Sequence, residues 1–157
     1  MFQKYQTLLR WWTLFCIQVI SIGIAAYFGL IFLISASDPT YLTFTIITLH
    51  FLITLYIGYV IYKIDTKNIQ PNNNVINWLY FWCDRAAPGL GILGLVVGII
   101  IIFGPAFQGL NVADLQSVAA VIKAIGYGVG TKLFATASGV ISALLIDFQV
   151  RLIGVSE

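Results

Sequence analysis

Four polar side chains lie close together near the C-terminal end of the sequence, among small and apolar residues. Thr131, Lys132, Thr136 and Ser138 fall in the segment GVGTKLFATASGVISALLID. At about 100° per residue, Thr131 and Ser138 share one side of a helix with Ser142, and Lys132 and Thr136 lie on the adjoining side. Hydroxyl groups can hydrogen-bond a water molecule or an ion, but they cannot carry a proton as a carboxylate does. We interpret this row as a candidate ion pathway that needs a proton-carrying acid from elsewhere.

A stripe of glycines marks an earlier segment, GLGILGLVVGIIIIFGP. Gly91, Gly94 and Gly98 are three or four residues apart, so they share one face of a helix. With Gly139 in the hydroxyl row, they provide small-residue surfaces on which helices can approach closely. Because glycine is common in membrane helices, ordinary helix packing is an alternative to oligomer assembly. Both interpretations stay open.

The residue types that an enzyme needs do not come together in this sequence. It contains no recognisable nucleophile–histidine–acid set, phosphate-binding loop or cluster of metal ligands. The net charge of +2 is too small to indicate nucleic-acid binding. Cys16 and Cys83 lack the spacing of a zinc site or of a disulfide framework, so we expect both to be packing residues. We therefore expect no enzymatic activity, no cofactor, no metal and no nucleic acid.

The composition indicates that lipid is the solvent. Of the 157 residues, 60% are hydrophobic and 9% are charged, whereas a soluble domain is about 25% charged. A large core cannot explain the difference, because a chain of this length buries only about two thirds of its surface in water. An all-α, polytopic membrane protein with four transmembrane helices is the predicted fold class. The four spans are about Trp11–Ile34, Tyr41–Ile64, Pro88–Phe107 and Gly126–Ile146.

The hydrophilic stretch 65–74 divides the chain into two helical hairpins. The aromatic segment Val75–Phe81 after it is typical of a short interfacial helix, and Pro88 suits the first turn of the next helix. Asn111 and Asp114 offer helix N-caps, so a helix should begin there and lead into the fourth span. The predicted domains are an N-terminal transmembrane hairpin (1–64), a short cytoplasmic loop with the interfacial helix (65–87) and a channel-forming transmembrane hairpin (88–157).

The positive charges predict the orientation in the membrane. In a four-span arrangement most of them lie on one side, and the side richer in Lys and Arg is normally cytoplasmic. Both termini are therefore expected in the cytoplasm. The residues on that side are Lys4, Arg10, Lys63, Lys67, Arg85 and Arg151, against Lys123 and Lys132 towards the other.

Two ionisable residues fall inside the predicted spans. Lys132 lies about two turns inside the outer end of the fourth span. It either extends to the outer interface, as long basic side chains do, or lines a pore or pairs with an acid of a partner subunit. His50, the sole histidine, either faces a neighbouring helix or a wet crevice, or has a functional role, which an intramembrane ionisable group suggests by default.

The glycine and hydroxyl segments, in this order, resemble the last two transmembrane helices of the MotA/TolQ/ExbB proton-channel family. The first reads APGLGILGLVVGI from Ala87 to Ile99, with Pro88 where the family's third span has its cytoplasmic end. The second reads GVGTKLFATASGV from Gly128 to Val140, similar to the small residues that surround a threonine in the family's last helix. The resemblance covers the C-terminal two fifths of the chain.

This resemblance implies a homopentamer in the bacterial inner membrane, arranged around two copies of a single-span partner of the MotB/TolR/ExbD type. The partner carries the proton-binding Asp, and ion flow drives one ring against the other. Thr136 takes the place of the family's threonine near that acid, and Thr131 and Ser138 line the same path. Gly94 and Gly98 allow close helix contact. The leading hypothesis is therefore an ion-conducting (proton) subunit of a proton-motive-force-driven motor or energy-transducing complex.

The sequence also departs from the family pattern. Leu95 stands where the family has a threonine, Lys132 replaces a small residue, and the proline that usually ends the last helix is absent. The loss of the threonine and the proline suggests altered or weakened conduction. The short 65–87 connection argues against docking to a flagellar rotor. The alternatives are a non-conducting membrane scaffold and an unrelated small transporter or holin-like protein.

Overall fold

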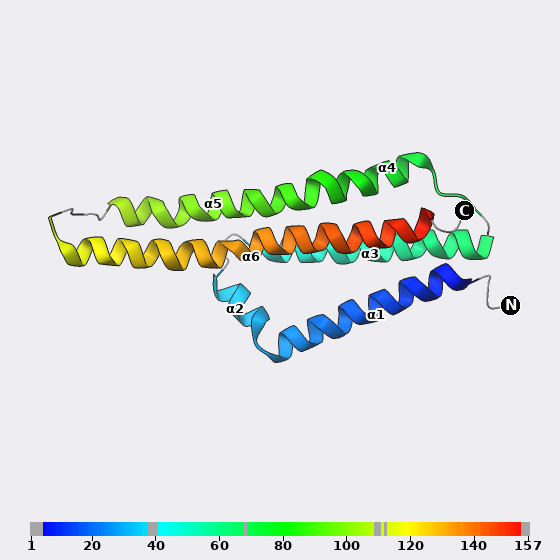
Figure 1. Cartoon of the computed structure of the whole chain (residues 1–157), viewed down its shortest axis with the longest axis horizontal. Helices are drawn as coiled ribbons and strands as arrows, with labels where there is room; N and C mark the ends of the chain where they lie inside the picture. The colour runs from blue at the N-terminus through cyan, green and yellow to red at the C-terminus, as the bar shows by residue number, and fades with distance from the viewer. Residues whose placement is uncertain (1–4, 38–40, 68, 109–110, 112, 155–157) are drawn as a thin grey trace.

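A computed structural model describes residues 5–37, 41–67, 69–108, 111 and 113–154, and within these ranges the chain is helical with no strand. Figure 1 shows long helices that run side by side. The elements are α1 (Gln6–Tyr27), α2 (Leu30–Ser37), α3 (Leu42–Lys67), α4 (Asn73–Phe81), the π-helical segment η2 (Trp82–Ala86), α5 (Ala87–Gln108) and α6 (Leu115–Gly154).

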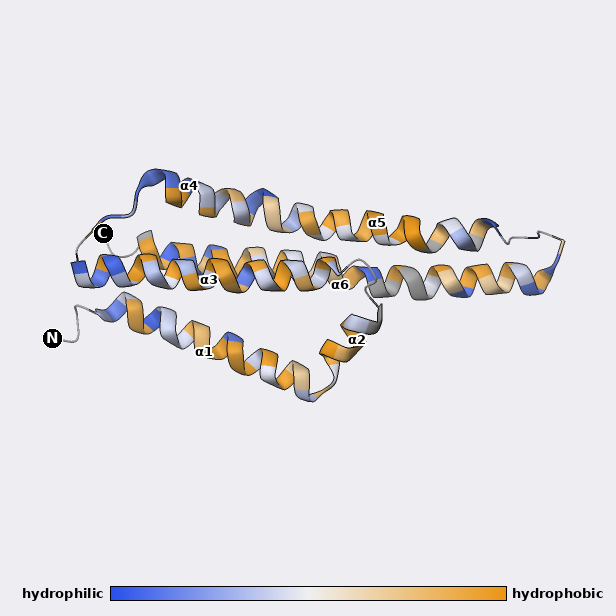
Figure 2. Cartoon of the chain, turned by 180° about the vertical axis from the view of Figure 1, so that it is seen from behind, coloured by the Kyte–Doolittle hydropathy of each residue, from blue (hydrophilic) through white to orange (hydrophobic). Residues whose placement is uncertain are grey.

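Within the described residues, four helical stretches are long and apolar enough to cross a membrane, which confirms the all-α class and the predicted number of spans. They are Gln6–Tyr27, Leu42–Lys67, Asn73–Pro105 and Lys132–Ile153. Figure 2 shows hydrophobic residues along the length of these helices and hydrophilic residues gathered where α4 begins. Such a distribution suits a multi-pass protein whose loops meet water and whose helices meet lipid.

The first span is not the single helix Trp11–Ile34 that its hydropathy predicts, because the chain turns between α1 and α2. Gly29 has a φ of +74°, in the left-handed region that glycine adopts without steric cost. Its N–H donates to the carbonyl of Ala26 at 3.0 Å, which satisfies one of the carbonyls left open at the end of α1. Gly29 therefore ends α1, and the chain changes direction there before α2 begins.

The expected interfacial helix and the third span form one continuous helical run. Asn72 caps its start by accepting a hydrogen bond from the Asn74 N–H at 3.0 Å. Pro88 has no N–H and its ring crowds the preceding turn, which a regular α-helix interior tolerates poorly. The turn before it widens into η2, where the Ala87 N–H donates to the carbonyl of Trp82, five residues back. The helix thus passes Pro88 without a loop.

The N-cap predicted for the last helix is confirmed. The Gln116 N–H donates to Asp114 Oδ1 at 3.0 Å, so Asp114 caps α6, whereas Asn111 Oδ1 accepts from the Ala113 N–H at 3.2 Å before the helix begins. From this cap α6 runs for 40 residues as one helix. The helix that was expected to lead into the fourth span is therefore continuous with it.

In space, α6 lies along α3 on one side and α5 on the other, and α1 leans outward from them (Figure 1). The start of α1, the connection from α3 to α4 and the end of α6 lie at one end of the molecule. At the opposite end, the α5–α6 hairpin extends beyond the start of α3. The two hairpins are therefore staggered along their common axis.

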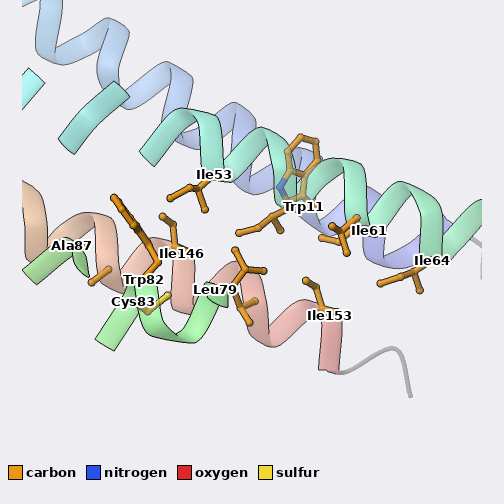
Figure 3. Packing of buried hydrophobic residues seen from close by; sticks show 14 residues of the cluster. Trp11, Ile53, Ile61, Ile64, Leu79, Trp82, Cys83, Ala87, Ile146 and Ile153 are labelled. Carbon is orange, nitrogen blue, oxygen red and sulfur yellow. The ribbon is translucent and has the colours of Figure 1, made fainter. Parts of the chain in front are cut away.

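The hydrophobic core gathers at the end where the α1 start meets α3, α4 and α6 (Figure 3). Ile57, Ile61, Leu79 and Ile146 are fully buried there. The Trp11 ring occupies the space over Gly58 that a Cβ at that position would need. This contact anchors α1 at its N-terminal end, while the residues of α1 beyond Gln18 are mostly exposed.

Asp65 helps to hold the same end together. Its Oδ2 accepts a hydrogen bond from the Leu8 N–H at 2.9 Å. Leu8 lies in the first turn of α1, whose N–H groups have no partner within the helix. The carboxylate at the end of α3 therefore caps α1 from outside its own sequence neighbourhood.

Candidate functional site: the α5–α6 seam and a buried polar centre

The two sides of α6 separate as expected. Its exposed face carries large apolar side chains, whereas Lys132, Ala135, Ser142 and Gln149 are buried against other helices. A polar group facing acyl chains costs several kcal/mol, so the hydroxyl-bearing side has to meet protein or water. In this chain much of it meets protein. The exposed face includes Leu133, Val140, Ile141, Leu144 and Phe148.

The predicted glycine stripe of α5 lies directly on α6. A Cβ at Gly91 would lie 3.0 Å from the Ala135 carbonyl oxygen, and one at Gly94 would lie 2.8 Å from the Ala135 Cβ. On the other helix, a Cβ at Gly139 would lie 2.5 Å from the carbonyl oxygen of Ala87. The two backbones therefore touch over several turns, and we call this contact the α5–α6 seam. Within one chain, the stripe serves helix packing.

Thr136 lies at this seam, half-buried. Its hydroxyl donates to the Gly91 carbonyl at 3.2 Å, across from one helix to the other. Ser138, also half-buried, donates to the Ala135 carbonyl of its own helix at 2.9 Å. The backbone of Thr131 is helical, but its side chain lies outside the described part of the structure. The structure thus places one of the three predicted hydroxyls at the seam and turns a second back on α6.

Lys132 does not reach along the surface to an interface. Its side chain is 1% exposed, and its aliphatic stem fills the place that a Cβ at Gly98 would occupy. The outward extension that we weighed for Lys132 therefore does not describe this conformation. The Lys132 side chain therefore lies inside the chain, in the part of the α5–α6 seam next to Gly98.

A second polar group lies deeper in the chain, between α1, α3 and α6. His50 Nδ1 is 3.1 Å from Ser142 Oγ, and His50 Nε2 is 3.4 Å from Gln18 Oε1. All three side chains are buried. We call Gln18, His50 and Ser142 the polar centre. The prediction that His50 faces a neighbouring helix is confirmed.

Another polar contact follows one turn further along α3. The Gln149 side-chain amide donates to Thr54 Oγ1 at 3.4 Å, with both residues buried. Our sequence reasoning singled out neither Gln18 nor Gln149. An amide within a run of apolar residues was the available signal, because a buried amide needs partners on another helix.

The chemistry open to these two sites is hydrogen bonding and proton binding. Thr136 can accept from a water molecule while it donates to Gly91, and an imidazole can exchange a proton at either ring nitrogen. Within the described ranges, no three His, Cys, Asp or Glu side chains gather as a metal site would require. Comparison of the chain with protein-family models, with curated proteins and with solved structures found no match.

Proposed function

We propose that this chain is the ion-conducting, proton-translocating subunit of a proton-motive-force-driven motor or energy-transducing complex in a bacterial inner membrane. One observation carries the proposal. The small, hydroxyl-bearing side of α6 packs on the glycine face of α5, with the Thr136 hydroxyl half-buried at the contact. These are the two segments that resemble the MotA/TolQ/ExbB family. In the proposed complex a single-span partner supplies the proton-binding Asp.

The Thr136 hydroxyl is suited to relay rather than to hold a proton. While its hydrogen is donated to the Gly91 carbonyl, its oxygen keeps lone pairs that can accept from a water molecule. A carboxyl group of the partner, placed on the open side of α6, would exchange its proton with such a water. We propose that Lys132 sets a positive potential at the outer end of this path and so limits cation entry.

Exposed charges support assembly into a homo-oligomer, as the family resemblance implies. The Ala87 carbonyl lies against Gly139 across the antiparallel seam. Because the two helical segments are antiparallel, the residue three positions before Ala87 lies level with the residue three positions after Gly139. Asp84 is therefore level with Ser142, which contacts His50. Asp84 and Arg85 are therefore exposed at the depth of the polar centre.

That depth is far from both ends of α3. His50 is about 12 Å from Leu42 and about 25 Å from Lys67, at a rise of 1.5 Å per residue. A charge that faces acyl chains at the middle of a bilayer costs about 3 kcal/mol by insertion scales. We propose that further copies of the chain, arranged as a pentamer with both termini cytoplasmic, cover Asp84 and Arg85.

The test is proton flux into liposomes that contain this chain and its partner, a single-span protein with an Asp near the start of its span. Thr136→Val should lower the flux by up to about tenfold, since one hydrogen bond is worth about 1.4 kcal/mol at most. Thr136→Ser should retain it. Thr13→Val is the matched control, because the Thr13 hydroxyl is exposed and donates only to Leu9 of its own helix at 3.0 Å. Unchanged flux in an assembled Thr136→Val complex would remove Thr136 from the path.

The second candidate function is a non-conducting scaffold, and the side chains around Gly98 at the α5–α6 seam favour it. Lys132 is buried over Gly98, and half-buried Leu95 supplies no hydroxyl where the family has one. In that case the chain organises other membrane proteins through its helix faces. The same liposomes separate the two functions, because a scaffold conducts no protons with the partner present at any applied potential.

A further inference from the structure

The polar centre joins three helices that are far apart in the sequence. Gln18 comes from α1, His50 from α3 and Ser142 from α6, and their exposed fractions are 8%, 7% and 4%. Gln18 is the one buried polar residue within the described part of α1. Each ring nitrogen of His50 faces one oxygen, at 3.1 Å and 3.4 Å. The imidazole is thus held from both sides.

The two oxygens suit both protonation states of the ring. In the neutral ring, the Nε2–H donates to Gln18 Oε1, and the Ser142 hydroxyl donates to Nδ1. When a proton binds Nδ1, the new N–H donates to Ser142 Oγ, whose hydrogen rotates away. The Nε2–H bond to Gln18 is kept and becomes stronger, because its donor now belongs to a charged ring. One proton can therefore be taken up by rotation of a hydroxyl hydrogen, without movement of any helix.

Few charged groups face this centre from the elements packed around it. On α6, Asp147 lies five residues beyond Ser142 and forms an ion pair with Arg151 at 2.8 Å, while Lys132 lies ten residues before it. Asp84 and Arg85 of η2 lie at the same depth on an exposed side. The described parts of α2 and α5 contain no charged residue. The remaining charges of the packed helices are further away, at Arg10 of α1, at Lys63, Asp65 and Lys67 of α3, and at exposed Lys123 of α6.

We infer that His50, held by Ser142 and Gln18, is a proton-binding site inside the membrane-embedded part of the subunit. The site takes one proton at Nδ1 and keeps both hydrogen-bond partners in the charged state. It lies within one chain and requires neither the single-span partner nor conduction at Thr136. The inference therefore goes beyond the proposed function, and the two are tested separately.

The experiment uses the full chain in lipid nanodiscs, purified without a histidine tag and labelled with ¹⁵N-histidine. Because His50 is the sole histidine, all imidazole ¹⁵N signals come from this site. A titration over the pH range in which the protein stays folded should show one protonation step. In that step Nδ1 should change from a hydrogen-bond acceptor to a donor. A ring that remains neutral over this whole range would overturn the proposal.

Variants then test the two partners. Ser142→Ala and Gln18→Leu each remove an acceptor that the charged ring uses, so each should move the midpoint to lower pH by about one unit, a tenfold loss in proton affinity. Ser142→Thr keeps the hydroxyl and should restore the midpoint. Thr54→Val is the matched control, since Thr54 is buried one turn away and accepts from Gln149. A midpoint that neither Ser142→Ala nor Gln18→Leu moves would contradict the assigned site. If these variants do not fold, the titration of the unaltered chain and of Ser142→Thr decides.

Discussion

At the scale of single residues, the hydroxyl groups of α6 are distributed among different partners. Thr136 donates to α5, Ser138 donates to its own helix, and Ser142 contacts His50 of α3. A hydroxyl left without a partner in a membrane interior costs several kcal/mol, so each hydroxyl needs a hydrogen-bond partner. The partner that it has determines which further hydrogen bonds it can form. Thr136 and Ser142 therefore differ in role although both belong to the small, polar half of one helix.

Gly139 should tolerate no side chain. A Cβ there would lie 2.5 Å from the Ala87 carbonyl oxygen, and a backbone atom cannot move aside without separating α5 from α6. We expect Gly139→Ala to destabilise the chain by about 1–3 kcal/mol, as overpacking does. Unfolding of the protein in mixed micelles measures this change.

Gly89→Ala is the control for Gly139→Ala, because a Cβ at Gly89 would meet no other atom within 4 Å. It should leave the midpoint of unfolding unchanged or raise it slightly, since alanine favours a helix more than glycine does. Equal losses in both variants would mean that close contact at the seam is not what Gly139 provides.

At the scale of the elements, two local interruptions decide where the helices go. Gly29 ends α1 in a left-handed conformation, and η2 carries the third span past Pro88. The first interruption separates α1 from α2, and the second joins α4 to α5. Each follows from the backbone of one residue, the conformational freedom of glycine in one case and the restricted backbone of proline in the other.

The turn at Gly29 gives a prediction for the first span. Gly29→Ala should lower the free energy of unfolding by about 1–2 kcal/mol, because a Cβ makes the left-handed conformation unfavourable. Gly23→Ala, also in the first span and with no atom within 4 Å of its Cβ position, should have no such cost. A gain in stability for Gly29→Ala would indicate that α1 and α2 prefer to form one straight helix.

At the scale of the whole molecule, the staggered hairpins do not fit one bilayer slab equally well. With 40 residues, α6 is about 60 Å long, twice the roughly 30 Å apolar core of a membrane. Polar residues mark the end of the α5–α6 hairpin, as expected for a part that reaches beyond the lipid. This stagger is also what leaves Asp84 and Arg85 level with the polar centre.

Assembly should depend on those two charges. We expect Asp84→Ala and Arg85→Ala each to weaken subunit association by at least about tenfold, since removal of a charged side chain that another subunit covers costs about 2 kcal/mol or more. Native mass spectrometry measures the subunit number, which we expect to be five in the unaltered protein. Lys123→Ala removes an exposed charge elsewhere on α6 and serves as the control. A chain that remains monomeric in lipid would contradict both the assembly and the motor function.

The sequence by itself determined the all-α class, the presence of four apolar helical stretches, the cap at Asp114 and the two-sided character of α6. These properties depend on hydrophobicity and spacing within one segment, which lipid and the helical period translate directly into structure. Only the tertiary structure decided that Lys132 is buried over Gly98, that Thr136 donates to Gly91 and that Ser142 contacts His50 across 92 residues. Such contacts depend on the stagger and rotation of helices against one another, because the partner of a buried polar atom is chosen by packing and not by its neighbours in sequence.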